Sequence, residues 1–403
     1  MSSGSGKPTC ADTRKICVVT GSRADYGLLS WLLHELRRRD EFQLQLVATG
    51  MHLSLQFGAT VEQIERDGFA VDARVEMLLA SDSAAAISKS VALGIAGFAD
   101  TLDRLRPDLL LVLGDRFEIF AAVQAAMFAS IPIAHIHGGE LTEGAVDDAI
   151  RHAISKMAHL HFVAAEPYRR RVIQLGEQPE CVFNVGALGV EAIRRSSLLS
   201  RDELSRSIGF DLAPPYLLVT YHPETLGSLA PETAAKELLN ALDAFPGHRI
   251  VFTGVNADAG GQSIDGLIRG YVARNQGRAA LWQSLGQQRY LSAVSHAEAV
   301  VGNSSSGLIE VPALAVPTVN IGTRQGGRVR ASTVIDVMDS RSAIIGGIHR
   351  ALSAEFRQAC REAVIPFDGG DTAARIADVL AATDFQPLVR KCFFDLGHHD
   401  GVL

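Results

Sequence analysis

The sequence predicts an α/β protein made of two Rossmann-like domains, each a doubly wound parallel sheet, with a cleft between them. Short apolar runs rich in β-branched residues alternate with segments whose apolar residues recur at helical spacing, which indicates strands buried beneath helices on both faces. A Gly/Pro-punctuated polar region near residues 186–212 interrupts this alternation, which then restarts once. The chain has 403 residues, more than a single core usually holds, so two or three domains are expected.

The first run of alternation defines the first domain, expected at residues 15–187 after a disordered tail at 1–14. Its opening strand is the β-branched run Lys15–Thr20, which ends at Gly21 and is followed by leucines at helical spacing. Further strands are expected at 42–48, 108–113, 131–136, 161–165 and 182–185. Helices are expected at 117–128 and from Asp147 to about 158.

The second run defines the second domain, expected at residues 188–371. Its strands are expected at 216–221, 249–253, 280–283, 299–301 and 318–321, with helices near 231–244 and 263–275. The last helical segment, 372–381, could belong to either domain, so residues 372–403 are candidates for packing back on the first.

Composition excludes several classes of protein. With 38 Lys and Arg against 45 Asp and Glu, the net charge of −7 argues against a nucleic-acid partner, and 47% apolar residues exclude a mostly disordered chain. No apolar run approaches about 18 residues, so no membrane span is expected. The polar N-terminus does not resemble a signal peptide, and the five scattered cysteines suggest a reduced, cytoplasmic compartment.

In parallel sheets, ligands bind at the carboxyl ends of the strands. After the first strand, Gly21 and Arg23 lead into a helix whose N-terminal N–H groups and added cation could bind a phosphate, although a solvated turn is the better interpretation of this segment taken alone. After the strand 108–113 comes Asp115, which either caps the next helix or serves catalysis.

The strand 131–136 leads into His135-Ile-His137-Gly-Gly-Glu140, and Asp147 and Asp148 follow at a helix start. Two histidines at i,i+2 near carboxylates could bind a metal, but no further ligand spacing supports this. His137, Glu140 and Asp147 near Asp115 are better interpreted as acid/base groups.

In the second half, His222 ends a strand, and Gly302-Asn-Ser304-Ser305-Ser-Gly307 ends another and opens a helix. Hydroxyls and N–H groups at a helix start suit a pyrophosphate, and Glu310 one turn later could accept the hydroxyls of a ribose. An ordinary serine cap would account for only one of the serines. The glycine-rich loop 322–330 carries three arginines, including Arg324 and Arg328, and is expected to contact phosphate.

Nine segments in order resemble one family closely: the hydrolysing UDP-N-acetylglucosamine 2-epimerases, especially the bacterial branch of sialic acid biosynthesis. They cover nearly the whole chain from about Arg14. The segments are TGSRADYG (20–27), LGDRFEIF (113–120), HIHGGE (135–140), DDAIRHAISKMAHLHF (147–162), VIQLGE (172–177), YHPET (221–225), GNSSSGLIEVP (302–312), NIGTRQGGRVR (320–330) and KCFFDLG (391–397).

The resemblance implies a GT-B architecture and a two-stage reaction. UDP leaves by anti elimination to give a 2-acetamidoglucal, and water then adds with inverted configuration at C2, releasing N-acetylmannosamine and UDP. The resemblance implies neither a nicotinamide nor a metal ion, so no cofactor is expected. The resemblance also suggests a homodimer or homotetramer.

The same resemblance suggests roles for individual residues. The UDP-binding set is Arg23, His222, Ser304, Ser305, Glu310 and Arg324, with Arg116 near the phosphates and Asn256 a weaker candidate; Glu310 would hold the ribose. Asp115 and Asp147 match acid/base carboxylates, and His222 could also stabilise the charge of the departing phosphate.

This chain departs from the family at His137, where several members have glutamate. Imidazole titrates near neutrality, so His137 could take that role, or Glu140 could. The alternative substrate is UDP-N,N'-diacetylbacillosamine, of legionaminic acid biosynthesis. A non-hydrolysing epimerase and a GT-B glycosyltransferase are further alternatives.

Overall fold

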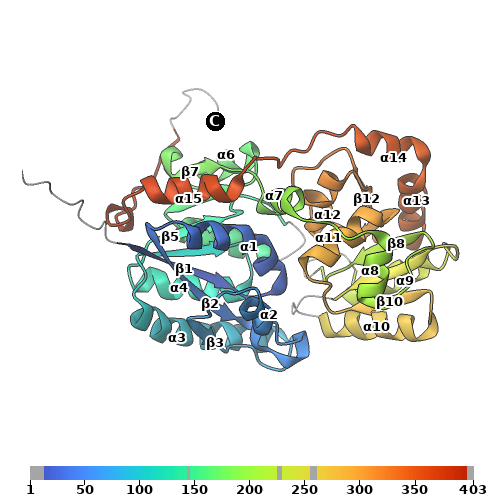
Figure 1. Ribbon diagram of the computed structural model, residues 1–403, viewed down its shortest axis with the longest axis horizontal. Helices are drawn as coiled ribbons and strands as arrows, with labels where there is room; N and C mark the ends of the chain where they lie inside the picture. Colours follow the sequence, from blue (N-terminus) through green and yellow to red (C-terminus); the bar gives the residue numbers. More distant parts are fainter. Residues whose placement is uncertain (1–12, 143–145, 225–228, 255–260, 397–403) are drawn as a thin grey trace, which may run out of the picture.

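Two parallel β-sheets lie side by side, each covered by helices, in the computed structural model of this protein (Figure 1). The structure describes residues 13–142, 146–224, 229–254 and 261–396. The two α/β domains expected from the alternation are therefore confirmed. The exact limits of the domains stay a prediction.

The sheet of the first domain has seven parallel strands in the order β3-β2-β1-β4-β5-β6-β7. The sequence order turns back at β1, so the carboxyl ends of β1 and β4 flank the point where ligands bind in such sheets. The strands are β1 (Arg14–Thr20), β2 (Phe42–Thr49), β3 (Ala73–Val75), β4 (Leu109–Leu113), β5 (Ile133–Ile136), β6 (Leu160–Val163) and β7 (Val182–Asn184).

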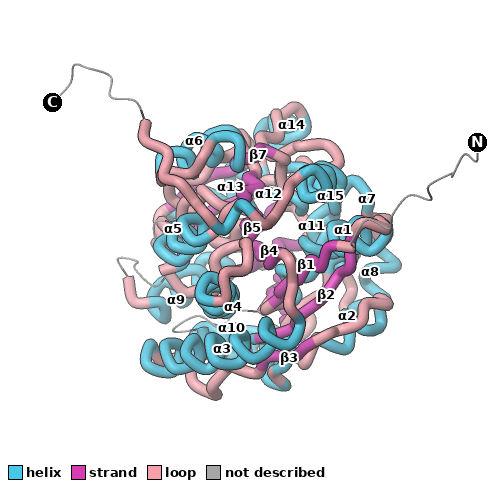
Figure 2. Tube along the Cα trace, turned by 90° about the vertical axis from the view of Figure 1, so that its left-hand side faces the viewer, coloured by secondary structure: helices cyan, strands magenta, loops and turns pink. Residues whose placement is uncertain are grey.

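Helices cover both faces of this sheet, because its strands are buried on both sides (Figure 2). Helix α1 packs on one face, and α3 and α4 pack together on the other. The helices are α1 (Arg23–Arg38), α2 (Val61–Arg66), α3 (Ala84–Leu105), α4 (Phe117–Phe128), α5 (Asp147–Met157), α6 (Glu166–Gln174) and α7 (Leu188–Arg195).

The sheet of the second domain has six parallel strands in the order β10-β9-β8-β11-β12-β13. The strands are β8 (Tyr216–Thr220), β9 (Arg249–Thr253), β10 (Ala279–Trp282), β11 (Ala299–Gly302), β12 (Thr318–Ile321) and β13 (Val334–Val337). The helices are α8 (Arg201–Ile208), α9 (Pro231–Leu242), α10 (Gly261–Arg274), α11 (Gln287–His296), α12 (Ser306–Ile309), α13 (Arg341–Leu352) and α14 (Ala354–Arg361).

Among the elements that were not expected from the sequence are β3, β13 and α3. The two strands are edge strands of three and four residues, too short for a clear alternation. Within the described residues, α3 is the one helix long and apolar enough to cross a membrane. Its buried face, which includes Gly94 and Phe98, instead packs on the first sheet and α4.

Two stretches of chain connect the domains, and they run against each other. The amide of Ala187 donates to the carbonyl of Phe367 at 3.0 Å, and a Cβ atom on Gly186 would lie 2.4 Å from the backbone of Gly369. A Cβ on Gly369 would lie only 1.9 Å from the carbonyl oxygen of Val185. Glycine is therefore required on both stretches where they touch.

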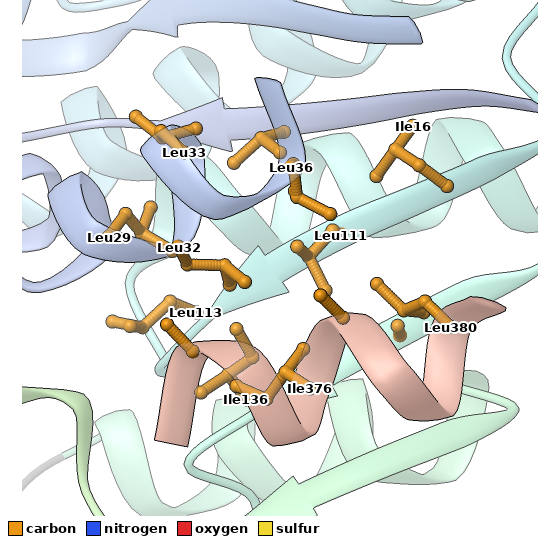
Figure 3. Close-up of a cluster of buried hydrophobic side chains, with 14 of the residues drawn as sticks. Ile16, Leu29, Leu32, Leu33, Leu36, Leu111, Leu113, Ile136, Ile376 and Leu380 are labelled. Atoms are coloured by element: carbon orange, nitrogen blue, oxygen red, sulfur yellow. The ribbon is translucent and has the colours of Figure 1, made fainter. Parts of the chain in front are cut away.

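The C-terminal helix α15 (Thr372–Ala382) packs back on the first domain, on the same face as α1. Figure 3 shows Ile376 and Leu380 from α15 meeting Leu36 and Leu111 from α1 and β4. Arg14, assigned above to a disordered tail, begins β1, and its guanidinium donates to the carbonyls of Leu380 and Ala381 at 3.0 and 2.9 Å.

Arg39, at the end of α1, also holds α15 in place. Its guanidinium lies 2.7 Å from a carboxylate oxygen of Asp378 and 2.9 Å from one of Glu35.

The segment after α15 is held by a buried carboxylate. Glu177 lies 2.6 Å from Nζ of Lys391, 2.9 Å from Nζ of Lys156 and 3.0 Å from Nε2 of His161. Burial alone would raise the pKa of Glu177, but these hydrogen bonds lower it to about 2. Lys391 also donates to the last carbonyls of α5, where a cation is stabilised by the helix dipole.

We expect Leu380→Ala to destabilise the first domain by about 2–5 kcal/mol, because the side chain is fully buried against α1 and β4. Val364→Ala is the matched control, since Val364 is 83% exposed and its truncation should cost less than about 0.5 kcal/mol. Urea unfolding followed by circular dichroism measures both. Equal, small effects would mean that α15 does not belong to this core.

Candidate active site

A pocket lies between the two domains, at the carboxyl ends of both sheets. Arg23, Met51, Phe57 and Thr60 line it from the first domain. The second domain contributes Thr220, His222, Thr253, Gln283, Tyr290, Ser304, Ser305, Ser306 and Glu310. Five residues expected from the sequence to bind the nucleotide therefore line one cavity: Arg23, His222, Ser304, Ser305 and Glu310.

Arg23 opens α1, which begins after the cap residue Ser22. The hydroxyl of Ser22 accepts the amide of Asp25 at 3.3 Å. Burial is the larger cause that lowers the pKa of the Arg23 guanidinium, and the nearby Arg289 lowers it further. A half-buried cation at a helix N-terminus is a place where an anion binds well.

The backbone of His222 is held in place by two hydrogen bonds with the side chain of Asn303. Its amide donates to Oδ1 of Asn303 at 2.8 Å, and Nδ2 of Asn303 returns a bond to its carbonyl at 2.9 Å. Gly302 permits this approach, because a Cβ there would lie 1.9 Å from the carbonyl oxygen of Thr220. The loops after β8 and β11 are thereby joined at the pocket.

The serine loop does not act as an ordinary helix cap. Ser305 is the cap residue of α12, yet its side chain makes no capping hydrogen bond. The hydroxyl of Tyr290 donates to Oγ of Ser306 at 2.8 Å, and Ser306 in turn bonds the carboxylate of Glu310. Ser304, Ser305 and Ser306 therefore line the pocket, and the side chain of Ser305 does not cap the helix.

Glu310 is a buried carboxylate with one oxygen, Oε2, that has no hydrogen-bond partner among the described residues. Burial is the main cause that raises its pKa. Gly189 leaves room for it, since a Cβ there would lie 2.3 Å from Oε1. An unsatisfied buried oxygen at a pocket wall suits a hydroxyl donor such as a ribose.

Asp115 is not a helix cap. The cap residue of α4 is Arg116, and the carboxylate of Asp115 instead forms an ion pair with the buried guanidinium of Arg151 from α5. Arg151 also donates to Oγ1 of Thr142 at 2.8 Å. The structural alternative named in the sequence analysis, a helix cap, therefore does not apply to Asp115.

The two histidines after β5 have different surroundings. Nε2 of His135 lies 2.7 Å from the carbonyl of Gly114, Nδ1 lies 3.1 Å from Oγ of Ser155, and burial lowers its pKa to about 3. His135 is thus a neutral structural residue. His137 lies beyond the end of β5 with φ of 66°, so the alternation of side chains along the strand does not extend to it.

His137 is held in this uncommon backbone conformation by the glycines that follow it. A Cβ on Gly139 would lie 2.4 Å from the carbonyl oxygen of Tyr168, and one on Gly138 would lie 2.9 Å from Oγ of Ser155. A left-handed non-glycine residue costs free energy that the surroundings must supply, and such residues concentrate at functional sites.

His137 and Glu140 form a buried pair in which Nδ1 lies 2.7 Å from Oε1. Nε2 of His137 has no hydrogen-bond partner among the described residues. Burial would raise the pKa of Glu140, but Arg328, His137 and Arg151 together lower it to about 2. Glu140 is therefore ionised near neutral pH and suited to orient the imidazole rather than to exchange protons.

Asp147 and Arg324, expected in different roles, lie together. Nη2 of Arg324 is 3.0 Å from Oδ2 of Asp147, and Nη1 is 3.4 Å from the carbonyl of Asn303. Glu224 holds the start of the loop that carries Arg324, because its carboxylate accepts the amide of Thr323 at 2.9 Å. The carboxylate and the cation thus meet across the cleft.

Arg116 brings in two carboxylates that the sequence did not single out. It lies 3.1 Å from Oε1 of the buried Glu118. Asp25 is also buried, and burial is the largest cause that raises its pKa to about 6, although Arg116 opposes the shift. Asp25 lies on the first turn of a helix, where an acidic residue is ordinary, so nothing in the sequence marked it.

Other residues of the site were missed: Arg151 holds Asp115, while Tyr290 and Gln283 line the pocket. Arg328 was expected with the other arginines of the loop 322–330 to contact phosphate, but it pairs with Glu140. Arg151 follows Asp147 by four positions on one helix, which was a usable signal. Asn256 lies outside the described residues. Among the described residues, no group of three or more His, Cys, Asp and Glu side chains could hold a metal ion.

The chain matches the family described as UDP-N-acetylglucosamine 2-epimerase over residues 34–381. It is 41% identical to the GDP/UDP-N,N'-diacetylbacillosamine 2-epimerase (hydrolyzing) of Campylobacter jejuni, over 80% of this chain and 84% of that protein. It is 40% identical to the polysialic acid biosynthesis protein P7 of Escherichia coli, over 88% of this chain and 90% of the relative.

The fold is shared with solved structures. The crystal structure of UDP-GlcNAc 2-epimerase from Neisseria meningitidis bound to UDP-GlcNAc matches with a TM-score of 0.76 at 17% identity, over 92% of this chain and all of that one. The Methanocaldococcus jannaschii enzyme in complex with UDP-GlcNAc and UDP also gives 0.76, at 16% identity, over 92% of this chain and all of that one. The expected GT-B architecture is confirmed.

Sequence motifs, fold and relatives agree, and the chain belongs to the UDP-N-acetylglucosamine 2-epimerase family.

Proposed function

We propose that this protein is a hydrolysing 2-epimerase that acts on a UDP-activated 2-acetamido sugar. The observation that carries the proposal is the position of an acid/base cluster beside a pocket suited to a nucleotide: Asp147 lies 3.0 Å from Arg324, which also contacts the carbonyl of Asn303, next to Ser304 on the pocket wall. A binding protein has no use for acid/base groups beside a pyrophosphate. The matching relatives at 41% and 36% identity carry the word hydrolyzing in their names.

The nucleotide occupies the second domain's side of the pocket in this proposal. Glu310 accepts the ribose hydroxyls through its unpaired oxygen, and Ser304 and Ser305 meet the pyrophosphate. Arg23 comes from the opposite wall and supplies positive charge. These groups bind the substrate and stabilise the UDP that departs.

The first stage is an elimination. A base takes the C2 proton, the C2–H electron pair forms the C1=C2 double bond, and the C1–O pair leaves with the β-phosphate of UDP. Water then adds across the double bond: its oxygen joins C1 as a base takes one of its protons, and an acid delivers a proton to C2 on the face opposite the one from which the first proton was removed. Asp115, His137 and Asp147 are the proposed proton-transfer groups.

His137 suits proton transfer better than Glu140 does. The ionised Glu140 can only accept a hydrogen bond, so Nδ1 of His137 carries the proton between them and Nε2 is the basic nitrogen. We therefore assign the role of the family glutamate to His137, with Glu140 orienting it. His222 is proposed to stabilise the developing phosphate charge.

Two substrates have support. Relatives named for GDP/UDP-N,N'-diacetylbacillosamine and for UDP-N,N'-diacetylbacillosamine are 41% and 36% identical, which favours that sugar. UDP-N-acetylglucosamine is the second candidate substrate, with a role in sialic acid biosynthesis. It is supported by the 40% identical relative that is named for polysialic acid biosynthesis. A relative from Neisseria meningitidis named UDP-N-acetylglucosamine 2-epimerase is 30% identical.

Purified protein incubated in D₂O with each UDP-sugar is expected to release UDP and a free 2-epimeric sugar that carries one deuterium at C2. We expect the larger kcat/KM with UDP-N,N'-diacetylbacillosamine. NMR of the sugar and coupled UDP detection give both results. UDP release without deuterium would exclude the elimination, and transfer of the sugar to an added acceptor would indicate a glycosyltransferase.

We expect Asp115→Asn to lower kcat by roughly 100-fold or more, the usual share of a general acid or base, with UDP affinity nearly unchanged. Glu310→Gln should instead weaken UDP binding by about 1–2 kcal/mol, through loss of a charge-assisted hydrogen bond. Isothermal titration with UDP and steady-state kinetics separate the two effects. Glu232→Gln, exposed on α9, is the control, and parallel losses in both quantities for both variants would contradict these roles.

A further inference from the structure

Arg328 of the second domain reaches into the first. It lies on the loop after β12, and its side chain is only 4% exposed. Nε donates to the carbonyl of Leu141 at 2.6 Å, Nη2 donates to Oγ1 of Thr142 at 3.1 Å, and Nη1 lies 3.0 Å from Oε2 of Glu140. All three contacts fall on the segment that follows His137.

Glu140 is consequently held at both oxygens. Oε1 faces Nδ1 of His137 at 2.7 Å, and Oε2 faces Arg328. With a side chain 2% exposed, an isolated carboxylate here would take up a proton, since burial disfavours the charged form. The guanidinium is the largest of the influences that oppose this effect of burial and keep the pKa of Glu140 at about 2.

The charge on Glu140 decides what His137 can do. An ionised carboxylate fixes the proton of the imidazole on Nδ1 and stabilises the imidazolium that forms when Nε2 takes a proton. A protonated Glu140 would do neither. The same loop is tied down one residue further on, where the amide of Val329 donates to the hydroxyl of Tyr168 at 3.0 Å.

We propose that Arg328 is a positioning residue for proton transfer at C2: from the second domain, it holds Glu140 as a carboxylate against Nδ1 of His137. This inference rests on the proposed function. Proton transfer therefore requires contact between the domains, because the cation that completes the pair is on the other side of the cleft.

Four other groups face this pair. Arg151, from α5, adds positive charge near Glu140 and Arg328, and Glu310, from the second domain, adds negative charge. Tyr168, from α6, and His135, from β5, complete the surroundings, and burial keeps both neutral near pH 7. Arg328 differs from Arg151 in contacting Glu140 directly, at 3.0 Å.

The test compares Arg328→Gln and Arg328→Lys with Arg330→Gln, which removes one charge from the same loop but pairs with Asp336 at 2.9 Å, away from Glu140. We expect Arg328→Gln to lower kcat about 10- to 100-fold, part of the contribution of a general base, with KM changed less than about threefold. The faster of the two UDP-sugars is the substrate.

The pH profile distinguishes positioning from mere structural support. Without the cation, burial raises the pKa of Glu140, so it binds a proton at a pH where it is ionised in the wild type. The acid limb of kcat should therefore move to higher pH in Arg328→Gln. Arg328→Lys retains the charge and should restore the position of the limb, while kcat stays low because the contacts of Nε and Nη2 with Leu141 and Thr142 are lost.

NMR of ¹³C-labelled glutamate carboxyls gives a readout that does not depend on activity. The Glu140 signal, identified by its loss in Glu140→Gln, should stay flat from about pH 4 upward in the wild type and in Arg330→Gln, and should titrate in Arg328→Gln. An unmoved acid limb or an unmoved Glu140 titration in Arg328→Gln would overturn the proposal. If the wild type releases no UDP from either sugar, the proposed function fails. The Glu140 titration in Arg328→Gln then still tests whether Arg328 keeps Glu140 ionised.

Discussion

Charge compensation inside the cleft is the constraint on which the rest of the site depends. Three carboxylates from the first domain lie there, and each faces a buried guanidinium: Asp115 faces Arg151, Glu140 faces Arg328 and Asp147 faces Arg324. Removing one ion from water costs several kcal/mol unless a partner replaces the solvent. Because Arg324 and Arg328 come from the second domain, neither domain alone satisfies its own charges, and the acid/base cluster exists as described only where the two meet.

The fold was predictable because its strands are buried on both faces. Strands such as Arg249–Thr253 and Thr318–Ile321 appear where the sequence predicts them, since a short, continuous apolar run between turn residues is typical of a strand in a covered parallel sheet. The edge strand Ala73–Val75 was missed for the converse reason. Three residues carry no measurable alternation, and their pairing with β2 is decided by neighbours far along the chain.

Some members of the candidate site could be predicted from the sequence, but their pairing could not. Position after a strand identified Asp115, His137, Asp147 and Arg324, because chemistry at the carboxyl edge of a parallel sheet follows from topology. That Arg324 meets Asp147 depends on a contact between residues 177 positions apart, and no local pattern encodes it. The left-handed backbone of His137 was equally hidden, since it results from the approach of α5 and α6 to the two glycines behind it.

The two connecting stretches have a mechanical consequence. A single linker would leave the domains free to rotate about any axis, whereas two linkers whose backbones touch at Gly186 and Gly369 restrict that freedom. A twist of one domain against the other would have to move these two backbones apart, because no side chains lie between them that could adjust instead. Such a restriction would favour the one relative placement of the domains in which Arg328 meets Glu140 and Arg324 meets Asp147.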